Sequence, residues 1–215
     1  EIFSISHVTT EEQRTLAKFL FNKGYKHIAL FYDCTPDLLN RFVPWLRFIA
    51  EMRALNPKCT IELRIALSEA FESKEQFIHY FDNKFPVEKL TWLLGKWIDT
   101  APFIIRKMFL FEREFEKLFT KGESTQAWIF MHDHQAVSAL NFCTHHHVSL
   151  SQNVGIVSLE NSRRCLPYGI TTCTSDWDAI GYLLAHAIIG DIPLKHTRRG
   201  FIASPALLLQ RRTTP

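Results

Sequence analysis

The sequence predicts an α/β protein with a mostly parallel sheet and helices on both of its faces. Short runs rich in β-branched and aromatic residues alternate with longer stretches of helical periodicity, which is typical of parallel strands joined by crossover helices. Capping and turn residues separate many of these runs. The chain has 215 residues, of which 47% are hydrophobic and 22% charged, so it can bury the core of one or two domains.

The first helix and strand are predicted from capping residues and an apolar stripe. Thr9 and Thr10 open overlapping capping boxes with Glu12 and Gln13, and Gly24 is placed to end the helix. The apolar run at 27–32 then predicts the first buried strand. The elements expected next are a helix from Pro36, a strand at 60–66 and a helix at about 73–85.

Residues 86–121 are predicted to form an extra helical hairpin. Two apolar helical faces are separated by Asp99–Pro102. These residues are predicted to end the first helix and to begin the second, with Pro102 in its first turn. The segment is unusually aromatic, so we expect some of its rings to face a second surface, with packing inside an enlarged lobe as the alternative. The aromatic residues are Trp92, Trp97, Phe103, Phe109, Phe111, Phe115 and Phe119.

The C-terminal part continues the alternation of strands and helices. Ser175 and Asp176 are predicted to cap a helix that Gly190 closes. The other expected elements are strands at 127–131, 153–159 and 207–210, and a helix at about 134–146.

Composition excludes several classes of function. A net charge of +3 without clustered Lys and Arg argues against a nucleic-acid surface, and no apolar stretch is long enough to cross a bilayer. The five cysteines lack CxxC spacing and are interpreted as buried thiols, which favours a reducing cytoplasm.

No motif of an enzyme or a metal centre is present. The chain lacks GxSxG, HExxH, Walker and GxGxxG patterns, so we expect no catalysis and no cofactor. His145, His146 and His147 are adjacent, and successive residues of a helix point in different directions. We therefore expect no metal site.

Five segments, in order, resemble the effector domain of LacI/GalR-type transcription regulators. They are TTEEQRTLAKFLFNKGYKHIALF, AWIFMHDHQAVSALNF, NVGIVSLENS, GITTCTSDWDAIGYLLAHAIIGD and LLLQRRTT. Tyr25 and His132 stand where the family pattern has His and Asn, and Pro44 stands where it tends to have Gly. The hairpin at 86–121 has no counterpart in the usual pattern.

The resemblance implies a periplasmic-binding-protein-like fold of two lobes with a ligand cleft between them. It assigns residues 1–7 to a hinge-entry segment, 8–173 to the second lobe, 174–205 to the first lobe and 206–215 to a terminal strand and tail. The start of the first lobe and any DNA-binding head are absent from this sequence. The N-terminus, without Met and opening directly on an apolar stretch, is interpreted as cut from something longer.

Four ligand-binding residues are expected from the resemblance. Asp133 ends a strand and could accept hydrogen bonds from a polar ligand, or simply cap the next helix. Arg41, in RFVPW, resembles a cleft arginine suited to hydroxyls or anions, or is a solvated helix arginine. Phe71 would stack on a ring of the ligand, or would simply be a buried aromatic residue of a loop. Ser175 would reach the ligand from a segment in which the chain crosses between the two lobes, or would cap the following helix.

The resemblance implies a domain that senses a small molecule, such as a sugar or a nucleobase-like effector. It also implies a homodimeric regulator that binds DNA only through another domain. Two alternatives remain open at this stage. One is a solute-binding receptor of a transporter with the same fold. The other is an interaction module without a ligand, in which the aromatic hairpin docks a partner.

Overall fold

The computed structural model describes residues 10–34, 43–67, 76, 79, 103–105, 115–116, 118, 126–150, 154–163, 165–195, 202 and 205–214. Within these residues the strands form one seven-stranded sheet in the order β3-β2-β1-β4-β5-β6-β7. Every neighbouring pair is parallel except β6 and β7, which are antiparallel. The predicted mostly parallel sheet is therefore confirmed.

The strands follow the apolar runs of the sequence. Strands β4 and β5 are buried at every position because helices cover both faces of the sheet. The bounds are β1 His27–Cys34, β2 Thr60–Leu67, β3 Phe103–Ile105, β4 Gln126–Phe130, β5 Val154–Ser158, β6 Thr171–Ser175 and β7 Ala206–Leu209.

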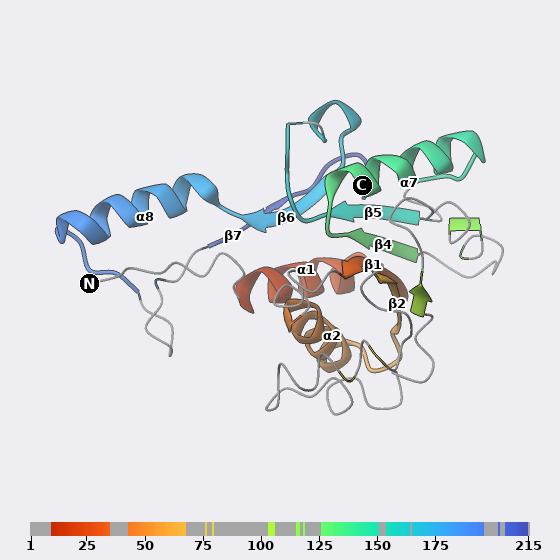
Figure 1. Ribbon diagram of the computed structural model, residues 1–215, viewed down its shortest axis with the longest axis horizontal. Helices are drawn as coiled ribbons and strands as arrows, with labels where there is room; N and C mark the ends of the chain where they lie inside the picture. The colour runs from red at the N-terminus through yellow and green to blue at the C-terminus, as the bar shows by residue number, and fades with distance from the viewer. Residues whose placement is uncertain are drawn as a thin grey trace.

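Helices α1 (Thr10–Asn22) and α2 (Val43–Leu55) lie together on one face of the sheet (Figure 1). Leu16 and Leu20 of α1 pack in one cluster with Phe48 and Met52 of α2 and with side chains of the central strands. Gly24 takes the left-handed conformation, with φ of 77°, so the chain can turn out of α1 without a Cβ clash.

Helix α7 (Asp133–His145) covers the opposite face, as Figure 1 shows. Phe115 is fully buried on this side of the sheet. Its ring stacks on Trp128 at 5.2 Å between centroids and meets Phe31 edge-on at 5.4 Å. This aromatic residue of the predicted hairpin therefore belongs to the hydrophobic core between the sheet and α7.

The predicted hairpin at 86–121 is wrong at one described position. Phe103–Ile105 form β3, an edge strand that pairs with Ile65–Leu67 of β2, instead of the start of a helix. An aromatic residue followed by two β-branched ones suits the edge of a parallel sheet. Residues 115, 116 and 118 are helical, and the rest of the segment lies outside the described residues.

Helix α8 (Trp177–Ile189) extends away from the sheet (Figure 1). Of the predicted caps, Asp176 and Gly190 are confirmed, since the Asp176 carboxylate accepts from the Ala179 amide and Gly190 has φ of 75°. Although α8 is strongly apolar, Ile188 and Ile189 are 77% and 68% exposed. No helix among the described residues is both long and apolar enough to span a membrane.

The segment after β7 returns into the middle of the sheet. Thr213 and Thr214 are fully buried. The Thr213 hydroxyl donates to the Ile156 carbonyl of β5 at 2.7 Å and accepts from the Thr171 amide of β6 at 2.8 Å. These two bonds join the tail to neighbouring parallel strands.

Candidate functional site

A pocket of about 340 Å³ opens at the carboxyl ends of β4, β5 and β6, beside the first turns of α1 and α2. This is where ligands bind in open parallel sheets, because the loops and helix N-termini diverge there. The pocket is lined by Glu12, Gln13, Leu16, Trp45, Phe48, Met131, His132, Leu159, Glu160, Cys173, Thr174, Ser175 and Trp177.

Glu12 brings a carboxyl group to the α1 side of this pocket. It accepts a short hydrogen bond from the Ser175 hydroxyl of β6, and its backbone carbonyl accepts from the Cys173 thiol at 3.6 Å. Burial raises the pKa of Glu12 to about 7, although the Ser175 hydrogen bond acts in the opposite direction. A carboxyl with this pKa changes its charge near neutral pH.

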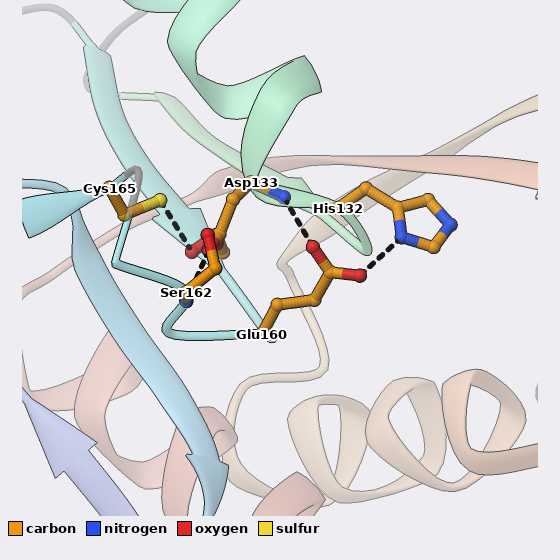
Figure 2. A network of polar contacts seen from close by, with 6 residues as sticks. His132, Asp133, Glu160, Ser162 and Cys165 are labelled. Atoms are coloured by element: carbon orange, nitrogen blue, oxygen red, sulfur yellow. Dashed lines mark hydrogen bonds and ion pairs between the residues drawn. The ribbon is translucent and has the colours of Figure 1, made fainter.

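His132 and Glu160 form the opposite polar side of the pocket. The His132 Nδ1 lies 2.6 Å from Glu160 Oε1, and the second carboxylate oxygen of Glu160 accepts from the Asp133 amide at 3.0 Å (Figure 2). The hydrogen bond from His132 is the largest cause that holds the pKa of Glu160 below its ordinary value. This pair joins the turn after β4 to the turn after β5.

Of the predicted ligand residues, Ser175 lines the pocket. It is buried at the end of β6, and its hydroxyl is already directed to Glu12. Asp176, not Ser175, supplies the side-chain cap of α8. These contacts therefore favour the pocket for Ser175 over its alternative role as the cap of α8.

Asp133 lies beside the pocket but is not part of its lining. Its carboxylate is buried and accepts from the Ser162 amide at 2.5 Å, in the loop after β5 (Figure 2). Burial alone would raise the pKa of Asp133, but hydrogen bonds from Cys165, Ser158 and Ser162 lower it below 3.8. The position before α7 is occupied by His132, which makes no side-chain cap bond, so Asp133 is not the N-cap.

Arg41 and Phe71 lie outside the described residues, and their ligand roles stay predictions. Four cysteines, Cys59, Cys143, Cys165 and Cys173, are buried free thiols, as the sequence predicts. No group of three or more metal-binding side chains is found in the described part of the chain.

Sequence reasoning did not identify Glu12, His132, Glu160, Trp45 or Trp177 as site residues. Glu12 was interpreted only as part of a capping box. Glu160 immediately follows the strand end at 158–159, as His132 follows the end of β4. The carboxyl ends of adjacent parallel strands meet at one edge of a sheet. The position of both residues just after a strand is therefore the signal from which they could have been predicted as site residues.

No model of a known protein family matches the chain, and no curated protein is similar to it in sequence. Solved structures are similar in fold. A periplasmic binding protein/LacI transcriptional regulator from Alkaliphilus metalliredigens, complexed with D-xylulofuranose, has 16% identity and a TM-score of 0.56 over all of this chain and 66% of its own.

Two other regulators are similar to the same extent. The transcription regulator CcpA of Lactococcus lactis has 16% identity and a TM-score of 0.56, over all of this chain and 65% of its own. A Lac repressor dimer bound to operator and the anti-inducer ONPF has the same identity and TM-score, over 98% of this chain and 51% of its own. The chain thus spans about half to two thirds of the length of these structures, and it has the fold of the periplasmic-binding-protein-like domains of LacI-type regulators.

Proposed function

We propose that this chain is the small-molecule-sensing part of a LacI/GalR-like transcription regulator. The observation that carries the proposal is the pocket at the carboxyl ends of β4, β5 and β6, which combines buried polar groups with aromatic walls. Such a mixture orients a small polar ligand through hydrogen bonds and holds its apolar faces against rings. The ligand that the similar regulator from Alkaliphilus metalliredigens carries, D-xylulofuranose, is a compound of this kind.

Ligand binding would act by changing the relation between two lobes. In the proposal, residues 8–173 form the second lobe, 174–205 belong to the first lobe and 206–215 return to the second. The projection of α8 from the sheet supports this division (Figure 1). Trp177 at the start of α8 lines the same pocket as Trp45 of the lobe, so a bound ligand would touch both parts.

DNA binding, in this proposal, belongs to a head domain outside this sequence, and the regulator acts in the cytoplasm as a homodimer. The described polar groups of the pocket hydrogen-bond one another, as Ser175 does with Glu12 and His132 with Glu160, and side chains held in place in this way can orient a bound ligand. The alternative of a transporter's solute receptor keeps the same pocket. The coding sequence upstream of Glu1 discriminates the two, by a DNA-binding head or a secretory leader.

The test is ligand-induced stabilisation of the 215-residue chain. We expect a compound among neutral sugars, nucleosides and sugar phosphates to raise the midpoint of thermal unfolding. A ligand at 100 times its Kd adds about 2.7 kcal/mol to the free energy of unfolding. Absence of stabilisation by every compound at saturating concentration would contradict the sensor role and favour the interaction module.

A matched pair of variants locates the binding site. Trp177 lines the pocket and Tyr182 lies one and a half turns further along α8, and the two are 59% and 58% exposed. We expect Trp177→Ala to weaken ligand-induced stabilisation and Tyr182→Ala to leave it unchanged. Equal loss in both variants would indicate that the ligand does not bind in this pocket.

A further inference from the structure

Carboxyl groups are prominent among the polar groups that line the pocket. Glu12 and Glu160 bring two carboxyl groups, and none of the described lining residues is Lys or Arg. Gln13 is 7% exposed, and its side-chain carbonyl has no hydrogen-bond partner among the described residues. The Ser175 hydroxyl already donates to Glu12. A buried, unpaired carbonyl at a pocket wall calls for a donor from the ligand.

A protonated amine meets these requirements better than a hydroxyl group does. An ionised carboxyl that is largely buried without a cation costs free energy, and a cation within hydrogen-bond distance offsets that cost. Glu12 and Gln13 both line the pocket, so a group with three donors, such as an ammonium, can serve both side chains. Trp45, Phe48 and Trp177 line the same cavity, and aromatic faces attract ammonium ions.

We propose that the pocket takes a polyol-like ligand that bears a protonated amine, held by the carboxylate of Glu12 and the side-chain carbonyl of Gln13. This inference rests on the proposed sensor function and specifies its class of ligand. It makes phosphorylated and carboxylated sugars poor ligands, because they would bring a second negative charge to a pocket that already holds Glu12 and Glu160.

Binding of such a ligand depends on pH. Burial raises the pKa of Glu12 to about 7, so an ammonium ligand must displace a proton from this carboxyl in acid. The described titratable groups that line the pocket with Glu12 are Cys173 of β6, His132 after β4 and Glu160 after β5. Of these, Cys173 contacts Glu12 directly, and α2 and α8 contribute Trp45, Phe48 and Trp177. Between pH 8 and pH 6 we expect the affinity of an alkylamine that stays protonated throughout, such as 1-amino-1-deoxysorbitol, to fall by about tenfold.

The experiment compares amine and hydroxyl members of matched pairs. The pairs are 1-amino-1-deoxysorbitol with sorbitol, glucosamine with glucose, and galactosamine with galactose, and glucose 6-phosphate is the anionic probe. Titration calorimetry of the 215-residue chain at pH 8 measures each Kd. We expect the amine member of at least one pair to bind at least tenfold more tightly than its partner, and glucose 6-phosphate not to bind.

Glu12→Gln tests the residue itself, because it keeps the shape of the side chain and removes the charge. We expect this variant to lose both the preference for the amine and the pH dependence. Glu11→Gln is the matched control, since Glu11 is in the same turn of α1 but pairs with Arg14 outside the pocket. Circular dichroism of the unliganded variants shows whether each remains folded.

The outcomes separate the two proposals. Equal affinity for amine and hydroxyl members, or an amine preference that survives Glu12→Gln, overturns the ligand class while the sensor function stands. Tight binding of glucose 6-phosphate also overturns it, and would fit the ligand role predicted for Arg41. Absence of binding by every probe overturns the ligand class, and the sensor function fails only if nucleosides also give no stabilisation in the thermal-unfolding test.

Discussion

The His132 Nδ1 and the Glu160 Oε1 lie 2.6 Å apart, and this pair joins the ends of two neighbouring strands at the floor of the pocket. The same carboxylate also accepts from the Asp133 amide in the first turn of α7. Glu160 therefore links the turn after β5 both to the turn after β4 and to the start of a helix.

Glu160→Gln is expected to weaken this link. Hydrogen bonding lowers the pKa of Glu160 in the folded chain below its value of 4.5 in the unfolded chain. The ionised carboxylate therefore stabilises the fold above pH 4.5, and this stabilisation is lost as the pH falls through the pKa of the folded state. The Glu160 side chain is 42% exposed, so we expect a loss below about 1 kcal/mol at pH 7. Urea denaturation at pH 7 and pH 3 measures the difference, which should shrink in acid. A difference that grows in acid would contradict the assignment.

Asp133→Asn is expected to destabilise the chain without any ligand. The Asp133 carboxylate is buried and accepts from the Ser162 amide, and charge-assisted bonds of this kind contribute about 2 kcal/mol. The lowered pKa means that this stability is present above pH 3.8 and is lost as pH falls further. Chemical denaturation gives the free energy of unfolding.

Asp178→Asn is the matched control for Asp133, because Asp178 is an exposed acidic residue in the first turn of α8. We expect it to change stability by less than about 0.5 kcal/mol. If Asp133→Asn leaves stability unchanged but abolishes ligand-induced stabilisation, the predicted ligand role of Asp133 holds and the structural one does not.

Glu12→Gln is expected to stabilise the unliganded chain at alkaline pH. The folded pKa of about 7 lies above the ordinary 4.5, so the wild type loses stability as pH rises from 4.5 through 7. The full loss is at most about 3 kcal/mol, reduced by the partial exposure of the side chain. Thermal unfolding between pH 5 and pH 9 should give a flatter profile for the variant. Parallel profiles would show that Glu12 ionises at its ordinary pKa.

Gly155→Ala and Gly181→Ala are expected to act in opposite directions. A Cβ at Gly155 of β5 would lie 2.6 Å from the Cζ of buried Tyr25, so the ring must move, at about 2 kcal/mol. A Cβ at Gly181, inside α8, meets no atom within 4 Å. Alanine there should add about 0.5–1 kcal/mol because it favours the helix. The midpoint of thermal unfolding is measured for both variants and for the wild type. A lower midpoint for Gly181→Ala would contradict the open surroundings of Gly181.

Much of the fold could be predicted from periodicity and caps, and the exceptions have physical reasons. Asp176 and Gly190 are local signals, and both bound α8 as predicted. Strand β6 was not predicted because Thr171–Ser175 is polar. All five residues are nevertheless buried, and partners distant in sequence bond the polar groups of Thr171. Its amide donates to the Thr213 hydroxyl, and its own hydroxyl bonds the Thr214 hydroxyl and the Arg211 carbonyl.

The site was less predictable because its chemistry depends on such distant partners. Glu12 has the sequence context of an exposed capping residue. Its burial follows from β6, which brings Ser175 against it across 163 positions of the chain. Asp133 shows the reverse case, because its place at a strand end predicts a ligand contact while the loop at Ser162 folds over its carboxylate.

The buried threonines after β7 have a consequence for synthesis. During translation β5 and β6 are made long before Thr213 and Thr214, which supply the hydroxyl groups that Ile156 and Thr171 bond in the finished sheet. Until those residues leave the ribosome, the Ile156 carbonyl and the Thr171 amide lack these partners, and unpaired backbone groups cost free energy once they are buried. The order of synthesis therefore makes the closing of this part of the sheet a late step, which follows the emergence of the tail and not that of the strands.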